Sequence, residues 1–333
     1  MMPRAVILRR FGSAKEALDV VEDHPKPKRR RDEVLIQVYG TSLNPIDCKT
    51  RRGEIPKILV ALPKVLGGDV SGKVVKSDSE AYPIGTRVMA LTNAFHFWVP
   101  WGCYCEFVAV PVRHLVRVPD NVDLLEAAGV PLVSVTASMA LNAIKPRPRD
   151  HKQSRILIHG GSGGVGSMCI QLAKHRGYEV YTTCSGMNTE FCKQLGADHA
   201  IDYTSNQFWN LYEKGYFDAI VDVIGGDVEQ HSLKILDPLH GTFVCVLNTN
   251  PMSTVFRSFL YRIKHALGFS PSYHVVMVSP NQYILKDVAA LLDKAIIRPV
   301  VSKIVPLSDV VAVHDDMDHG VSPRGKVVLS IHS

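Results

Sequence analysis

The chain lacks several features that would have narrowed its function at once. Its 333 residues include only seven cysteines, scattered at positions 48, 103, 105, 169, 184, 192 and 245. An odd and dispersed set does not form a disulfide framework, so we expect reduced thiols in an intracellular protein. No apolar run approaches the ~20 residues that cross a bilayer. The net charge of +6 is mild for this length and gives no reason to expect nucleic acid as a partner.

Internal repeats and low-complexity segments are lacking too. The composition, 46% hydrophobic and 21% charged, is that of a globular protein, and the length favours two domains. The first twenty residues contain no acid before Glu16, which is also a property of targeting presequences. We instead interpret AVILRR as a first strand and ALDVVEDHP as a second strand.

The character of the sequence changes near residue 126. The preceding residues form short strand-like runs broken by glycine and proline, such as VLIQVYG and GDVSGKVV, which predicts a β-rich domain. The stretch LLEAAGVPLVSVTASMALNAI, at 124–144, is helical in composition. After it, apolar strands such as RILIHG and EVYTTC alternate with helical stretches at 164–176, 187–195, 206–214 and 228–236. This alternation predicts a parallel sheet with helices on both faces, an α/β doubly wound fold.

The last fifty residues change again. A helix is expected at 286–297, followed by strands and turns that rejoin the first domain. The predicted organisation is therefore a β-rich part at 1–126, a dinucleotide-binding domain at 127–283, and a returning segment at 284–333.

Residues 159–166, HGGSGGVG, contain five glycines in eight positions. Gly161, Gly163 and Gly166 match G-x-G-x-x-G, and the motif follows an apolar strand and opens a helix, which is the context that makes it specific. The first glycine is expected to permit a tight turn, the second to admit a pyrophosphate, and the third to let helix and strand pack closely. The loop Gly161–Ser162–Gly163–Gly164–Val165–Gly166 should therefore hold the phosphates at a helix N-terminus.

The second strand of this domain indicates which dinucleotide binds. An NAD site places an acid at the end of that strand, to hold the ribose 2′-hydroxyl. Here the strand ends in Thr183–Cys184–Ser185–Gly186, without an acid. The hydroxyl of Ser185, with Tyr203 at the end of the third strand, favours NADPH, because a serine leaves room for a 2′-phosphate and donates to it.

Seven segments then indicate a family. In chain order they are SLNPIDCKTRRG, LGGDVSGKV, GVPLVSVTASMAL, HGGSGGVG with IQLAK, LGADHAIDY, DVIGG and RGKVVL. They resemble the medium-chain dehydrogenase/reductase superfamily, in its quinone oxidoreductase branch, along the whole chain. The resemblance implies a GroES-like catalytic domain and an inserted Rossmann domain. It also implies a homodimer and a mitochondrial location, or otherwise a cytoplasmic one.

The resemblance also implies where the cofactor lies. Asn44 and Asp47 should lie beside the nicotinamide as the catalytic pair, and Thr136 should contact the nicotinamide or its ribose. Asn188 stands where relatives often have a lysine, so a positive charge is missing from the expected phosphate site. Arg324 or Lys326 of the C-terminal tail is expected to supply that charge by reaching the 2′-phosphate. Three further cofactor contacts are expected at Val223, Gly225 and Asn248.

Many relatives use zinc, and the ligands for it are not in place here. A catalytic zinc takes three ligands of the Cys, His or Glu type. The position of the family's first cysteine ligand falls within LNPID, which contains no cysteine. The family's Gly-His-Glu stretch reads Gly67–Gly68–Asp69 here, so its histidine is replaced. Cys103 and Cys105 alone cannot complete a tetrahedral site, and His96 is interpreted as a packing or pocket residue. We therefore expect no metal.

An NADPH-dependent enzyme without metal favours acceptors that need little polarisation. Quinones and conjugated enones spread the incoming charge over the whole conjugated system, so the predicted function is hydride transfer to such an acceptor. Two alternatives remain, an enoyl thioester reductase and a non-catalytic NADPH-binding partner or sensor protein. The segment GEIPKI lacks the tyrosine of related enoyl thioester reductases.

A basic amphipathic segment at 251–269 has more than one interpretation. Val255, Phe256, Phe259, Leu260, Ile263 and Leu267 recur at helical spacing, with basic residues between them. The segment is either a helix packed on the core or at a dimer contact, or a lid over the acceptor, or a surface that touches a membrane peripherally.

Overall fold

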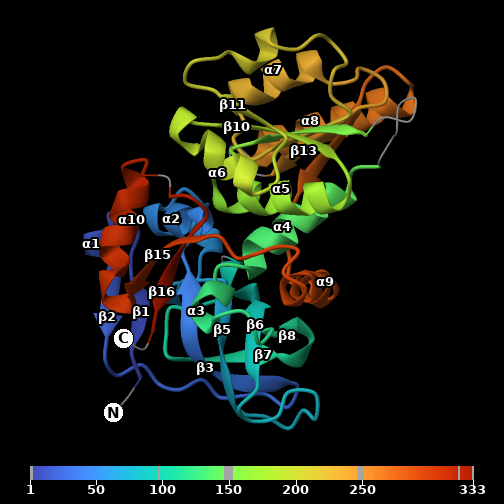
Figure 1. Ribbon diagram of the computed structural model, residues 1–333. Helices are drawn as coiled ribbons and strands as arrows, with labels where there is room; N and C mark the ends of the chain where they lie inside the picture. The colour runs from blue at the N-terminus through green and yellow to red at the C-terminus, as the bar shows by residue number, and fades with distance from the viewer. Residues whose placement is uncertain (1–2, 97, 146–152, 247–250, 322, 332–333) are drawn as a thin grey trace. The chain divides into compact units, whose positions relative to one another are not determined.

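The computed structural model describes residues 3–96, 98–145, 153–246, 251–321 and 323–331, and the chain divides into two compact units (Figure 1). Unit 1 comprises Met1–Val135 with Ser279–Ser333, and unit 2 comprises Thr136–Val278. The first division falls within helix α4 (Pro131–Asn142). It differs from the expected boundary at 126/127, because the sequence changes character where the helical region begins, whereas the contacts change inside α4.

Unit 1 is built on a seven-stranded sheet with strand order β15-β16-β3-β5-β6-β8, and β7 also pairs with β3. Residues along the first part of β3 (Glu33–Ser42) alternate between buried and partly exposed, because alternate side chains of a strand point to opposite faces. The C-terminal strand β16 (Lys326–Ser330) pairs antiparallel with Gly40–Ser42 at the end of β3. The last strand of the chain thereby lies beside the residues that precede LNPID.

The remaining elements of unit 1 surround this sheet. A second sheet has the order β2-β1-β4. The other strands are β1 (Ala5–Leu8), β2 (Leu18–Val21), β4 (Lys64–Val65), β5 (Asp69–Lys76), β6 (Arg87–Leu91), β7 (Phe107–Pro111), β8 (Leu115–Arg117) and β15 (Val301–Pro306). The helices are α1 (Ala14–Ala17), α2 (Pro45–Arg52), α3 (Leu124–Ala127), α9 (Gln282–Asp293) and α10 (Val310–Asp318).

Unit 2 is a Rossmann-type domain, and the predicted fold class is confirmed. Its six parallel strands have the order β11-β10-β9-β12-β13-β14. In Figure 1, α5 and α6 lie on one side of this sheet and α7 on the other. The strands are β9 (Arg155–His159), β10 (Glu179–Cys184), β11 (His199–Asp202), β12 (Ala219–Asp222), β13 (Thr242–Val246) and β14 (Ser272–Val276). The helices are α5 (Gly164–His175), α6 (Thr189–Gln194), α7 (Asp227–Ile235) and α8 (Pro251–Ala266).

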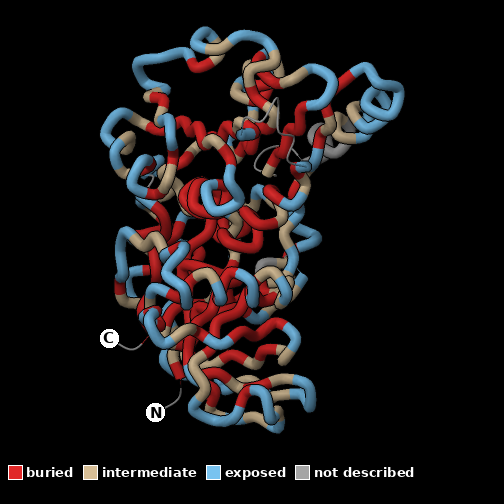
Figure 2. Tube along the Cα trace, turned by 45° about the vertical axis from the view of Figure 1, so that its right-hand side comes forward, coloured by how far each residue is buried: buried red, intermediate tan, exposed pale blue. Residues whose placement is uncertain are grey.

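Burial explains why these strands were recognisable. All four residues of β12 are buried, as are the last four of β9, because a parallel sheet is covered on both faces. Figure 2 shows the buried segments inside each unit and the exposed ones along its loops. Among the described residues, no helix is long and apolar enough to cross a membrane.

Three expectations about local structure were wrong. The helix expected at 206–214 is only a short 3-10 turn, Phe208–Asn210, and the side chain of Asn206 bonds the carbonyl of Asp202. The region 124–144 is broken into α3 and α4, because Pro131 disfavours a helical residue before it. The tail contains helix α10 where only strands and turns were expected, and its buried Val310, Val313 and His314 follow a helical spacing.

The core-packing interpretation of segment 251–269 was also wrong for most of its apolar residues. Phe259, Leu260, Ile263 and Leu267 are exposed. The side chains of Val255 and Phe256 lie outside the described part of the structure.

Candidate active site

The glycine-rich loop connects the buried strand β9 to the N-terminus of α5. The tight turn that we expected at Gly161 lies at Gly160, which has φ 68° and therefore adopts the left-handed conformation that glycine tolerates. Gly163 has φ −78° and ψ 175° and is the N-cap of α5. Helix N-terminal amides and the helix dipole at this point favour a negative group.

The three motif glycines differ in what surrounds them. A Cβ atom at Gly161 would lie 2.0 Å from Thr182 Oγ1, and one at Gly166 would lie 2.1 Å from the carbonyl oxygen of Gly160. These two glycines are therefore required by packing. A Cβ at Gly163 would meet only the Gly160 oxygen at 3.4 Å, an ordinary contact. No described residue requires a glycine at 163, so the space beside it is open to a ligand.

The loop after β12 lies next to this turn. A Cβ at Gly160 would be 3.0 Å from the Val223 side chain, and Gly225 has φ 78°. Asp222 Oδ1 accepts hydrogen bonds from the backbone N–H groups of Ile224, at 2.8 Å, and Gly225, at 3.0 Å. Asp222 Oδ2 is buried and has no hydrogen-bond partner in the described part of the structure. Because buried polar atoms are nearly always bonded, this oxygen is a candidate acceptor for a ligand hydroxyl. The loops after β9 and β12 lie where strand order reverses, the usual place for dinucleotides in such sheets.

The loop after β10 brings two serines and an amide together. Asn188 Nδ2 donates to Ser185 Oγ at 2.9 Å and to Ser162 Oγ at 3.3 Å. Asn188 therefore connects the phosphate loop to the end of β10. Tyr203 is 59% exposed, and its backbone N–H donates to the Cys184 carbonyl at 3.1 Å. The nearby Asp202 carboxylate is engaged by Thr204 and Ser205, which donate to it.

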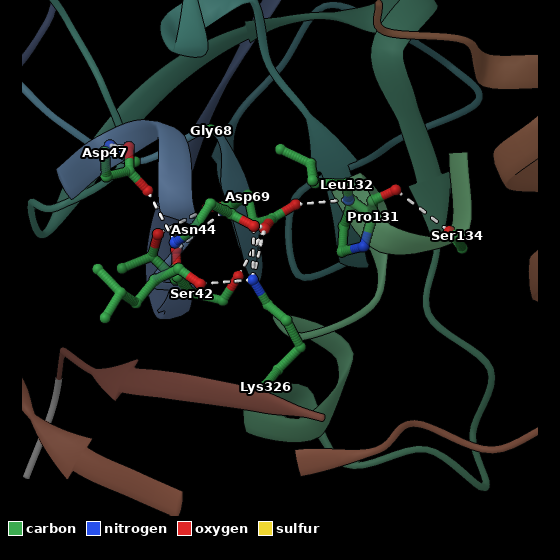
Figure 3. A network of polar contacts seen from close by, with 12 residues as sticks. Ser42, Asn44, Asp47, Gly68, Asp69, Pro131, Leu132, Ser134 and Lys326 are labelled. Atoms are coloured by element: carbon green, nitrogen blue, oxygen red, sulfur yellow. Dashed lines mark hydrogen bonds and ion pairs between the residues drawn. The ribbon is translucent and has the colours of Figure 1, made fainter. Parts of the chain in front are cut away.

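A second polar cluster lies in unit 1, at the start of α2 (Figure 3). Asn44 is 1% exposed, and its Nδ2 donates to Asp69 Oδ2 at 2.9 Å. The Lys326 ammonium donates to Asn44 Oδ1 and to the Leu43 carbonyl, both at 2.6 Å, and lies 3.9 Å from Asp69 Oδ2. Asp69 also accepts from Ser42 Oγ at 2.5 Å and from the Leu132 N–H at 2.7 Å. The amide of Asn44 is thus held at both its oxygen and its nitrogen.

Asp47 fixes the loops around this cluster. Its carboxylate accepts from the Asn44 N–H at 3.0 Å and from the Gly67 N–H at 3.1 Å, and it is 3% exposed. Burial raises the pKa of Asp47 to about 6, and the two backbone hydrogen bonds and the Lys326 charge oppose that rise. Asp47 therefore ties the N-terminus of α2 to the turn at Gly67, and titrates closer to neutral pH than an ordinary aspartate.

The two tail residues differ in their surroundings. The Lys326 ammonium donates to Leu43 and Asn44 within the Asn44–Asp69 cluster of unit 1, and its expected contact with a 2′-phosphate stays a prediction. Burial lowers the pKa of Lys326, and Asp69 and Asp47 oppose that shift. Arg324 is exposed, immediately before β16. Thr136 is 2% exposed in α4, and Asn248 lies outside the described residues.

Sequence reasoning missed several members of these clusters. Ser42 and Asp69 carry contacts that no motif assigned to them, and the buried carboxylate of Asp222 was not assigned a role either. The position of Asn188 was noted, but not its hydrogen bonds to the two serines. Asp69 and Asp222 each stood inside a segment that supported the family resemblance. An aspartate at the boundary of an apolar strand was the available signal, because a charge placed there needs a partner.

The donors around Asn44 do not suit a zinc ion. Zinc in proteins takes cysteine, histidine and carboxylate ligands, whereas this cluster offers one amide and one carboxylate that already face an ammonium. The described residues contain no group of three or more His, Cys, Asp or Glu side chains placed to hold a metal. His96 stacks on Trp98, with ring centroids 4.8 Å apart.

Comparison with known proteins identifies the family. Residues 30–120 match the model described as alcohol dehydrogenase GroES-like domain, and residues 195–329 match the one described as zinc-binding dehydrogenase. The NAD(P)H oxidoreductase RTN4IP1, mitochondrial, of Danio rerio is 31% identical over 90% of this chain and 84% of the relative. The NADPH-dependent alkenal/one oxidoreductase, chloroplastic, of Arabidopsis thaliana is 38% identical over 60% of this chain and 52% of the relative.

A solved structure agrees with these sequence matches. The quinone oxidoreductase from Coxiella burnetii superposes with a TM-score of 0.86 and 32% identity, and the match covers 99% of each chain. With the GroES-like and Rossmann units both present, the chain belongs to the medium-chain dehydrogenase/reductase superfamily, and within it the chain is similar to quinone oxidoreductases and RTN4IP1-type reductases.

Proposed function

We propose that this chain is an NADPH-dependent reductase that transfers hydride to a quinone or a conjugated enone. The observation that carries the proposal is the cluster around Asn44, where an amide, a carboxylate and an ammonium bond one another and do not form a set of zinc ligands. An isolated carbonyl needs strong polarisation before it accepts hydride, and a conjugated acceptor needs much less. The relatives named as quinone and alkenal/one oxidoreductases support the same acceptor class.

The cofactor proposal rests on the two loops of unit 2. The free space beside Gly163 and the N-terminal amides of α5 suit a pyrophosphate. Ser162, Ser185 and Asn188 offer hydroxyl and amide donors to a 2′-phosphate, with Tyr203 close in the chain. NADPH would supply the hydride. The unpartnered Asp222 Oδ2 is available to a cofactor hydroxyl.

In unit 1 we assign positioning roles. Asn44 is held by Lys326 and Asp69, so its amide cannot rotate without breaking hydrogen bonds at both ends. Asp47 holds the backbone of Asn44 in place. We propose that this rigid corner serves the nicotinamide half of the cofactor and the acceptor, with Thr136 contributing from α4.

A non-catalytic NADPH-binding protein and an enoyl thioester reductase are the alternatives. The decisive experiment follows NADPH absorbance with para-benzoquinone, a short enone, crotonyl thioester or no acceptor. Rapid oxidation with the first two supports the proposal. Tight NADPH binding without acceptor-dependent oxidation would indicate a binding protein, and a clear preference for the thioester would indicate an enoyl reductase.

Location and assembly are separate proposals. The RTN4IP1-type proteins are named as mitochondrial, and we propose a mitochondrial location and a homodimer for this chain. Fractionation of cells that express the chain from its natural gene, and the solution mass of the purified protein, test these two points separately.

A further inference from the structure

Helix α8 packs on unit 2 through its polar side. Tyr261 stacks on Tyr273 with ring centroids 5.1 Å apart, and Arg257 pairs with the buried Glu229 at 3.3 Å. His265 Nδ1 lies 2.9 Å from the Ser270 carbonyl oxygen. Arg257 and Tyr261 are four apart, so they lie in one row along the helix, and that row faces the protein, whereas His265 at the end of the row is exposed.

The opposite row of α8 is apolar and exposed. It begins at Phe259, two residues after Arg257, and two residues correspond to about 200° around an α-helix. We define the α8 ridge as Phe259, Leu260, Ile263 and Leu267, which are 59%, 40%, 45% and 63% exposed. Phe269, just beyond the helix, is 77% exposed. A surface helix normally buries its apolar side, so this orientation is the reverse of the usual one.

Positive charge borders the ridge on both sides. Arg262 and Lys264 are exposed and stand one position before and after Ile263, about 100° to either side of it around the helix. Residues 251–269 contain no aspartate or glutamate. An apolar strip with lysine and arginine at its edges is the pattern of helices that lie in the interface of an anionic membrane.

We infer that the α8 ridge docks on an anionic lipid surface. Phe259, Ile263 and Leu267 would enter the boundary between headgroups and acyl chains, while Arg262 and Lys264 would extend along the surface to lipid phosphates. This inference does not depend on the reductase activity, although quinones with long apolar tails partition into the same phase.

A second copy of the chain is a poorer occupant. In a two-fold contact centred on the ridge, the same patch meets itself, so the exposed Arg262 and Lys264 side chains would approach their own counterparts. Four side chains also provide much less than the ~800 Å² per partner that a stable dimer usually buries. A lipid surface meets neither difficulty, because its charge is opposite and its area is unlimited.

Vesicle sedimentation of the full chain tests the inference. We expect binding to vesicles of phosphatidylcholine with phosphatidylglycerol, weakened by added salt, and little binding to phosphatidylcholine alone. The double variant Phe259→Ser, Ile263→Ser should lose affinity for the anionic vesicles by about tenfold or more, because two inserted side chains are removed. Arg262→Glu should also weaken binding, by placing a negative charge at the ridge.

The matched control is Leu239→Ser, which removes an exposed apolar residue of unit 2 outside α8. It should bind vesicles like the wild type, and all variants should keep the wild-type melting temperature and NADPH affinity. Failure of the wild type to sediment with anionic vesicles, or equal loss in the control, would overturn the inference. So would a wild-type dimer that the ridge variant converts to monomers, which would identify a second copy as the occupant.

Discussion

Gly163 is a glycine that packing against the described residues does not require. We predict that Gly163→Val abolishes NADPH binding and leaves the fold intact, because the side chain would fill the free space that a pyrophosphate needs. Fluorescence titration of NADPH and a thermal melt measure the two parts. Gly166→Val is the matched control, since its side chain would strike the Gly160 backbone, and it should lower the melting temperature. Normal NADPH affinity in Gly163→Val would remove this loop from the proposed site.

Ser185 offers a direct test of the choice between NADPH and NADH. Ser185→Asp places a negative charge against the proposed 2′-phosphate, so we predict weaker NADPH binding by about tenfold to a hundredfold, with NADH then preferred. Asn188→Ala should weaken NADPH binding less, because it removes the amide that orients Ser185 and Ser162 without adding charge. A wild type that binds both cofactors equally would contradict the NADPH assignment.

Asp47 gives a pH dependence with a definite sign. Its pKa in the folded chain is about 6, above its ordinary value near 4. The unfolded carboxyl therefore ionises first as pH rises. The proton on the folded Asp47 carboxyl makes its full contribution to the free energy of unfolding below about pH 4. This contribution, on the order of 2–3 kcal/mol, is lost as the pH rises to about 6.

Melting temperatures across this pH range, compared with those of Asp47→Asn, measure the effect. The stability difference between wild type and variant should shift in favour of the variant up to about pH 6 and then stay level. A difference that does not change with pH would show that the carboxyl titrates normally.

At the scale of elements, the parallel strands were the easiest to predict. β10 has the limits that were expected from EVYTTC, and all of its residues after Glu179 are buried. Helix α10 was missed because its few buried positions are followed by three aspartates, Asp315, Asp316 and Asp318. α8 was recognised as a helix, but its period alone could not say which side faces the protein. That choice depends on partners distant in sequence, Glu229 and Tyr273.

Dependence on partners distant in sequence also limited how much of the site could be predicted. The glycine loop and Ser185 follow from short motifs, because local turn geometry and strand ends determine them. The place of Lys326 does not, since it requires β16 to pair with β3 across most of the chain. Only that pairing puts the ammonium next to Asn44 and Leu43. A charged residue in an otherwise apolar strand indicated a buried partner without naming it.

For the whole molecule, the proposed reaction needs no metal. The family model that matches residues 195–329 is described as a zinc-binding dehydrogenase, whereas the Asn44 cluster offers zinc an unsuitable set of donors. We predict that activity survives prolonged chelation and that purified protein carries no stoichiometric zinc. Elemental analysis and activity before and after chelation check this. One zinc per chain, with activity lost on its removal and restored by its return, would favour an ordinary ketone as substrate.

The central claim is that the chain reduces a conjugated acceptor with NADPH, and steady-state NADPH oxidation with para-benzoquinone tests it most directly. The account predicts acceptor-dependent turnover in the wild type. Asn44→Ala and Asp47→Ala should reduce turnover without abolishing it, because both residues position groups and neither forms a covalent intermediate. No turnover with any quinone or enone, in wild-type protein that binds NADPH tightly, would contradict the account. So would an Asp47→Ala variant that binds NADPH normally and is completely inactive.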